Sequence, residues 1–169
     1  MATPKRHGAL PGTYFVSSRT WESRALFVKE PLCAIFTRTL LDYRDRKLFQ
    51  IHAFVLMPDH FHLLLMPSAE TTLERAVQYI KGGSAHAIGK ELDLRFPVWQ
   101  RGFSDHRIRD VEDYQLHVRY IEQNPVKRKL VVSAGDYAWS SASSRFQMDE
   151  PPQRLKPPVI SMAGAVRHG

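Results

Sequence analysis

Two histidines separated by a single residue are the side chains of this sequence best placed to do chemistry. His60 and His62 lie in a hydrophobic run, residues 54–66, that only Pro58 and Asp59 interrupt. Because side chains alternate between the two faces of a strand, both imidazoles point the same way and can share one metal ion. The alternative is a pair of structural histidines bonded to neighbouring backbone, and the pair alone leaves both interpretations open. On a continuous strand Asp59 would point to the opposite face, so it is not counted as a ligand.

A tyrosine and an asparagine four residues apart form a second candidate set. Tyr120 and Asn124 lie on one face of a predicted helix, with His117 beside them. Tyr114 is the rival phenol, but it falls on the apolar packing stripe of that helix. The alternative is an ordinary interface tyrosine and a helix-terminal asparagine.

Together these groups suffice for metal-assisted attack on a phosphodiester. A phenol is a poor nucleophile at neutral pH, and a phosphodiester repels an attacking anion. A divalent cation, Mg²⁺ or Mn²⁺, would neutralise charge at phosphorus and favour the phenolate. The sequence therefore predicts Tyr120 as the nucleophile and His60, His62 and Asn124 as metal ligands.

The composition suits a soluble protein with a polyanionic partner. The chain has 169 residues, enough for one domain with a proper core, and carries 24 basic against 17 acidic residues for a formal charge of +7. Its single cysteine, Cys33, excludes an intramolecular disulfide, and no segment is apolar enough to cross a membrane. We expect a cytoplasmic protein, with nucleic acid as the leading partner.

The pattern of apolar residues predicts four strands and three helices. Strands are expected near residues 14–20, 49–57, 61–66 and 103–109. Helices are expected near 31–46, 73–92 and 111–123, the second capped by Thr72 and the third capped by Asp110 and ended by Pro125. Gly82 and Gly83 in the second helix indicate a bend or a close contact there.

The order of these elements predicts an α+β fold. Strand, helix, strand, strand, helix, strand is the ferredoxin-like βαββαβ pattern with an antiparallel sheet, here followed by an added C-terminal helix that carries the nucleophile. We expect one domain over residues 1–146 and a Pro-rich, flexible tail over 147–169.

Basic side chains surround the predicted site along the chain. Such residues hold phosphates and give salt-dependent affinity with little base information. Trp99 is expected either to stack on an unpaired base or to pack at the rim of the core. The candidate nucleic-acid-binding residues are Lys81, Arg101, Arg107, Arg109, Lys127 and Arg128.

Four segments resemble one protein family in the same order and spacing. They are residues 57–64 (MPDHFHLL), 99–108 (WQRGFSDHRI), 120–127 (YIEQNPVK) and 137–141 (YAWSS). The first is similar to the His-hydrophobe-His motif of HUH single-tyrosine nucleases, in the form found in REP-associated tyrosine transposases, which are IS200-like. The resemblance is continuous from about residue 14 to 144.

The resemblance implies a specific activity. His60 and His62 would bind a divalent ion, and Tyr120 would cut single-stranded DNA, giving a 5′-phosphotyrosine and a free 3′-hydroxyl, at hairpins from repetitive extragenic palindromes. The third ligand of related transposases is usually glutamine where this chain has Asn124. A bacterial, nucleoid-associated protein, monomer or homodimer, is implied as well.

Two other functions remain open at this level. One is a non-catalytic hairpin-binding or regulatory protein derived from a transposase. The other is a replication initiator or relaxase that uses the same motifs on another substrate, although the chain has no helicase domain.

Overall fold

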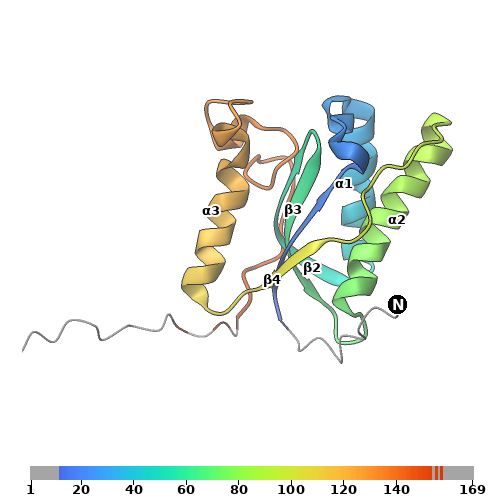
Figure 1. The fold of residues 1–169 in the computed structure, drawn as a ribbon. Coiled ribbons are helices and arrows are strands. Elements are labelled where there is room, and N and C mark those ends of the chain that lie inside the picture. Colours follow the sequence, from blue (N-terminus) through green and yellow to red (C-terminus); the bar gives the residue numbers. More distant parts are fainter. Residues whose placement is uncertain (1–11, 154, 156, 158–169) are drawn as a thin grey trace, which may run out of the picture.

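A four-stranded antiparallel sheet with helices on both faces makes up the protein, as a computed structural model describes it for residues 12–153, 155 and 157 (Figure 1). Three short 3₁₀ turns complete the regular structure of the described residues. The elements, in chain order, are β1 Tyr14–Arg19, α1 Glu30–Asp45, β2 Phe49–Met57, β3 His60–Pro67, α2 Leu73–Leu92, β4 Ser104–Arg107 and α3 Val111–Lys127.

The topology confirms the predicted ferredoxin-like pattern. The strand order is β2-β3-β1-β4, and each neighbouring pair is antiparallel. The tight turn between β2 and β3 contains Pro58 and Asp59, where the proline could not donate to a ladder. Strand β3, which carries both predicted histidine ligands, is therefore central in the sheet.

The two faces of the sheet carry hydrophobic clusters of different size. Helices α1 and α2 cover one face, and residues of β3 such as Phe61, Leu63 and Leu65 point into the larger cluster there. Helix α3 lies alone on the other face, over a smaller cluster that includes Leu64, Tyr114 and Ile121. Because β3 alternates, His60 and His62 share the α3 face with Leu64.

The predicted helix starts are confirmed, and the two glycines leave α2 unbroken. The side chains of Thr72 and Asp110 accept the backbone N–H of Arg75 and Asp113 as N-caps. A Cβ on Gly83 would lie 2.7 Å from the ring of Tyr43 on α1, so this glycine permits a close helix contact.

The predicted end of the last helix is wrong. Helix α3 continues through Pro125 to Lys127, which places Asn124 inside the helix. Proline removes one intrahelical bond, to the carbonyl of Ile121, and this costs about 3 kcal/mol in a helix interior. Here Pro125 is buried near the helix end, and its carbonyl accepts the N–H of Leu130 at 2.9 Å, so packing and the following turn offset the loss.

The start of the predicted tail lies against the sheet. The backbone N–H of Asp149 donates to the carbonyl of Ile51, and the N–H of Ile51 donates to the Asp149 carboxylate. Met148 packs against the larger cluster. The boundary at residue 146 stays a prediction, and residues 154, 156 and 158–169 lie outside the described part of the chain. Within the described residues, no helix combines the length and hydropathy needed to span a lipid bilayer.

Candidate active site

The two histidines of β3 face helix α3 side by side. The ring centroids of His60 and His62 are 4.7 Å apart, and both side chains are buried. Two buried imidazoles that point into the same space are expensive to desolvate unless their nitrogens have partners. The partners of the ring nitrogens therefore decide how this cost is met.

One nitrogen of each ring has a local partner. Nδ1 of His60 donates to the carboxylate of Asp59 at 2.6 Å, and Nδ1 of His62 lies 2.5 Å from Oγ of Ser17 on β1. With the ring proton on Nδ1, Nε2 keeps its lone pair for another partner. Partners of this kind orient the imidazoles of metal sites.

Two buried acceptors on β3 and α3 have no hydrogen-bond partner among the described residues. They are Nε2 of His62 and Oδ1 of Asn124, which lies one helical turn past Tyr120 and is only 5% exposed. A buried acceptor without a donor costs roughly 1–3 kcal/mol. A divalent cation would satisfy both lone pairs, so the residues present fit a metal centre.

The predicted phenol lies next to the histidines. The ring centroids of Tyr120 and His62 are 5.2 Å apart, and Phe15 of β1 contacts both rings. Tyr120 is 42% exposed, so its hydroxyl is within reach of a large substrate. The rival Tyr114 is buried in the α3 cluster, as the packing stripe predicted.

The environment of the pair is positive. Burial, together with smaller contributions from His60 and from the positive charges of Arg128 and Arg19, lowers the pKa of His62 to about 3. Burial also lowers the pKa of His60, although Asp59 opposes the shift. Both imidazoles are thus neutral at pH 7, the form that binds metals, in a field that attracts anions.

The family model described as "Transposase IS200 like" matches residues 16–124, which include both histidines and Tyr120. The chain belongs to the IS200-like transposase family. Transposases are DNA-processing enzymes, which gives the broad class of this IS200-like protein.

Curated IS200-like relatives carry a more specific name. The chain is 29% identical over 142 residues to the REP-associated tyrosine transposase of Escherichia coli K12, covering 83% of this chain and 82% of the relative. It is 32% identical over 103 residues to a putative REP-associated tyrosine transposase of Haemophilus influenzae, covering 55% and 58%. The predicted resemblance to REP-associated tyrosine transposases is confirmed.

Solved structures share the fold. A REP-associated tyrosine transposase bound to a REP hairpin superposes with a TM-score of 0.70 at 24% identity, covering 95% of this chain and all of that one. A putative transposase from Deinococcus radiodurans gives a TM-score of 0.50 at 20% identity, covering 72% and 97%. The α+β fold predicted for this IS200-like chain is confirmed.

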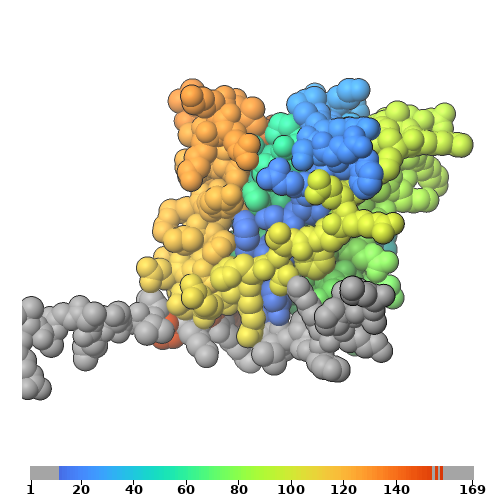
Figure 2. All heavy atoms as spheres, viewed as in Figure 1, coloured from blue at the N-terminus to red at the C-terminus, as the bar shows by residue number. Residues whose placement is uncertain are grey.

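The predicted DNA-binding residues differ in how exposed they are to solvent. Figure 2 shows the segment around β4 crossing the front of the molecule between α2 and α3. Arg101, Arg107 and Arg109 are exposed along it, and Lys127 and Arg128 are exposed at the end of α3. Lys127 lies over the ring of Tyr120, with its Nζ 5.8 Å from the centroid.

Lys81 and Trp99 are held by the protein itself. Lys81 Nζ donates to the carbonyls of Gln100 and Gly102 at 2.7 and 2.5 Å, which ties α2 to the segment before β4. Its role toward DNA stays a prediction. Trp99 is buried, stacks on Phe27 and donates its indole N–H to Ser84, so the packing interpretation is confirmed.

Sequence reasoning missed three residues of the site. Ser17 and Arg19 lie two apart on β1, on the same face as the histidines, and Arg19 pairs with His60 across the strands. A continuous strand would turn Asp59 away from the histidines, but Asp59 lies in the turn before β3 and bonds to His60. The alternation of β1 was visible in the sequence, whereas its pairing with β3 was not.

Proposed function

We propose that this protein is a metal-dependent single-stranded DNA endonuclease and strand transferase that cuts by attack of Tyr120. The observation that carries the proposal is the convergence of an exposed phenol with two neutral imidazoles, whose ring centroids lie 4.7 Å apart, in a positive field. Such a set suits phosphodiester transesterification, which needs no external energy source.

His60, His62 and Asn124 would hold the metal ion, Mg²⁺ or Mn²⁺. When bound, the ion supplies a Lewis acid that neutralises charge on a non-bridging phosphate oxygen. The fit rests on the two buried lone pairs without partners, Nε2 of His62 and Oδ1 of Asn124. Asp59 and Ser17 position the imidazoles through the opposite ring nitrogens.

The chemical step exchanges one phosphate ester for another. The Tyr120 oxygen forms a bond to phosphorus, and the bond from phosphorus to the 3′-oxygen of the neighbouring nucleotide breaks. The phenol proton goes to solvent, which reaches the 42% exposed side chain, and the leaving 3′-oxygen takes up a proton. The products are a 5′-phosphotyrosine and a free 3′-hydroxyl, and the linkage is kept for a later strand transfer.

Arg19 and Arg128 are placed to hold the phosphate during this step. Both charges act on His60 and His62, and within the described part of the chain neither guanidinium has an ion pair. A guanidinium binds phosphate oxygens through two parallel hydrogen bonds. Arg107 at the end of β4, Arg101 before it and Arg109 after it, together with Lys127, would bind flanking phosphates.

The substrate we propose is a REP-type hairpin with a single-stranded flank. Support comes from the relatives named REP-associated tyrosine transposase and from the solved relative bound to a REP hairpin. Within one chain Tyr120 already lies beside His62, which favours a monomer that cuts in cis over a dimer that exchanges its tyrosine helices.

The test is formation of a covalent adduct with a hairpin DNA labelled at its 3′ end, because Tyr120 keeps the 3′ part of the strand. The wild type should form an adduct with Mn²⁺ or Mg²⁺ and lose it with EDTA. Tyr120→Phe should abolish the adduct while hairpin binding persists. Tyr114→Phe is the matched control, since that phenol is buried away from the pair, and it should keep the adduct.

Two outcomes would overturn the proposal. An adduct that persists in Tyr120→Phe would place the nucleophile elsewhere. Hairpin binding that EDTA does not change, with no cleavage in either metal, would instead favour the regulatory DNA-binding protein.

A further inference from the structure

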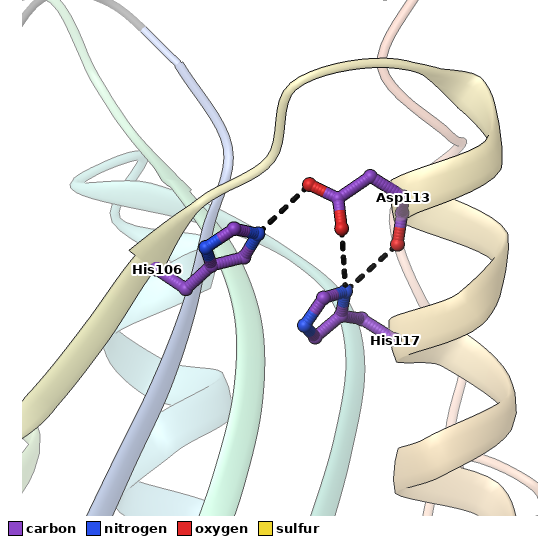
Figure 3. A group of neighbouring side chains, drawn as sticks. All are labelled: His106, Asp113 and His117. Atoms are coloured by element: carbon purple, nitrogen blue, oxygen red, sulfur yellow. Dashed lines mark hydrogen bonds and ion pairs between the residues drawn. The ribbon is translucent and has the colours of Figure 1, made fainter. Parts of the chain in front are cut away.

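Three side chains outside the proposed reaction meet where β4 joins α3 (Figure 3). His106 comes from β4, and Asp113 and His117 come from the first two turns of α3. One potential ligand atom from each lies within 4.8 Å of the other two. No residue of this cluster belongs to the ligand set of the candidate active site.

The carboxylate of Asp113 lies between the two imidazoles. Nε2 of His106 is 2.8 Å from Oδ2 of Asp113, and Nδ1 of His117 is 3.2 Å from Oδ1 (Figure 3). The two rings stack with centroids 4.9 Å apart and an angle of 21° between their planes. Asp113 is only 8% exposed, which keeps its carboxylate fixed between the rings.

We propose that His106, Asp113 and His117 form a second divalent-cation site, selective for a transition ion such as Zn²⁺. Two imidazole nitrogens and one carboxylate oxygen are a common set for zinc and a poor one for Mg²⁺, which prefers oxygen. The side chain of His106 is 39% exposed, so water or a substrate oxygen can reach the fourth position.

Binding at this site requires each ring proton to lie on the nitrogen that does not contact the ion. Ligation through Nε2 places the single proton of neutral His106 on Nδ1, and ligation through Nδ1 places that of His117 on Nε2. His117 gives up its 2.8 Å bond to the Asp113 carbonyl. The backbone N–H of Arg109 still donates to Oδ2 of Asp113, at 2.9 Å, and this hydrogen bond would orient the carboxylate toward the ion.

The side chain of Arg109 places a positive charge close to this carboxylate. Its Nε lies 3.6 Å from Oδ2 of Asp113 and would repel a cation. The side chain is 76% exposed, so solvent screens the charge and the guanidinium can turn outward.

An ion here would join β4 to the nucleophile helix. The ring of Phe15 is 4.8 Å from His117 and 5.8 Å from Tyr120, which connects the cluster to the phenol by direct packing. Occupancy would therefore restrain the start of α3 relative to the sheet. The inference does not depend on the strand-transfer proposal, because the cluster shares no ligand with the other site.

The test is a Zn²⁺ titration of the full chain carrying His60→Ala and His62→Ala, which removes the first site. Calorimetry should show one equivalent bound. Long-range ¹H–¹⁵N spectra of the histidine rings should show two imidazoles, His106 and His117, that change from protonated to metal-bound nitrogen at Nε2 and Nδ1. If the double variant does not fold, the same spectra of the wild type report each ring separately.

Two variants decide the outcome. His106→Gln should weaken Zn²⁺ binding by at least about tenfold, as expected for loss of one ligand of three. His86→Asn is the control, because His86 is exposed on α2, and it should leave binding unchanged. Failure of Zn²⁺ to shift the His106 and His117 signals, or equal binding by His106→Gln, would overturn the proposal.

Discussion

Replacement of Ser17 by alanine tests whether the histidines are positioned for a cation. Oγ of Ser17 lies 2.5 Å from Nδ1 of His62 and is the partner that can fix the ring proton on that nitrogen. Ser17→Ala leaves Nδ1 buried without a partner and lets the ring adopt the other tautomer. Loss of such an outer partner weakens metal binding by about 10- to 100-fold, or about 1.4–2.7 kcal/mol.

The assay is the Mn²⁺ concentration that gives half-maximal covalent adduct with hairpin DNA, because the adduct forms at Tyr120, beside the histidine that Ser17 contacts. Ser17→Ala should shift the midpoint upward by about one to two decades. The adduct yield at saturating Mn²⁺ should return to the wild-type value, since Tyr120 and the ligands are unchanged.

Ser18→Ala is the matched control. Ser18 is the next residue of β1 and points to the opposite face, where its Oγ makes a 3.4 Å bond to the Gly102 carbonyl. It should leave the Mn²⁺ midpoint unchanged. An unchanged midpoint for Ser17→Ala, or equal shifts for both variants, would refute the positioning role of Ser17.

Three other predictions follow from the packing and charge described above. Gly82→Ala should raise the free energy of unfolding by about 0.5–1 kcal/mol, because a Cβ there meets nothing within 4 Å, whereas Gly83→Ala should lower it by about 1 kcal/mol or more. Urea denaturation checks both, and a stabilised Gly83→Ala would contradict the close contact. Burial lowers the pKa of His52 in the folded protein. As the pH falls below about 6.5, the unfolded chain therefore binds a proton at this histidine before the folded protein does, and the free energy of unfolding decreases. His52→Phe should flatten the decrease of Tm between about pH 7 and 5, and an unchanged slope would contradict this assignment. Arg19→Gln and Arg128→Gln should each reduce the salt dependence of hairpin binding by about one unit of slope in fluorescence anisotropy, and a slope equal to that of the wild type would remove that residue from the phosphate contacts.

The parts of the fold that the sequence predicted are those set by local periodicity. Strand β3 and helix α2 follow from alternation and from three- and four-residue spacing. The end of α3 was misjudged because the rule for Pro125 is local, whereas the packing that keeps the helix intact is tertiary.

In the candidate site, too, the sequence predicted the residues that are neighbours along the chain and missed those that only the fold brings together. His60, His62, Tyr120 and Asn124 could be named because each pair lies within a few residues along one element. The position of Arg19 depends on the register between β1 and β3, which joins residues about forty apart. The cluster of His106 and His117 likewise needs β4 and α3 to meet, which no spacing along the chain reveals.

The unequal clusters on the two faces of the sheet have a consequence for motion. Helix α3 is held by the smaller one, while the larger one between the sheet and α1 and α2 stays intact without it. Elements with little buried apolar area open at a lower free energy than the whole domain. Backbone amides of α3 should therefore exchange with deuterium by a local opening well before those of β3, so that the face of β3 that carries the histidines can become exposed without unfolding of the whole protein.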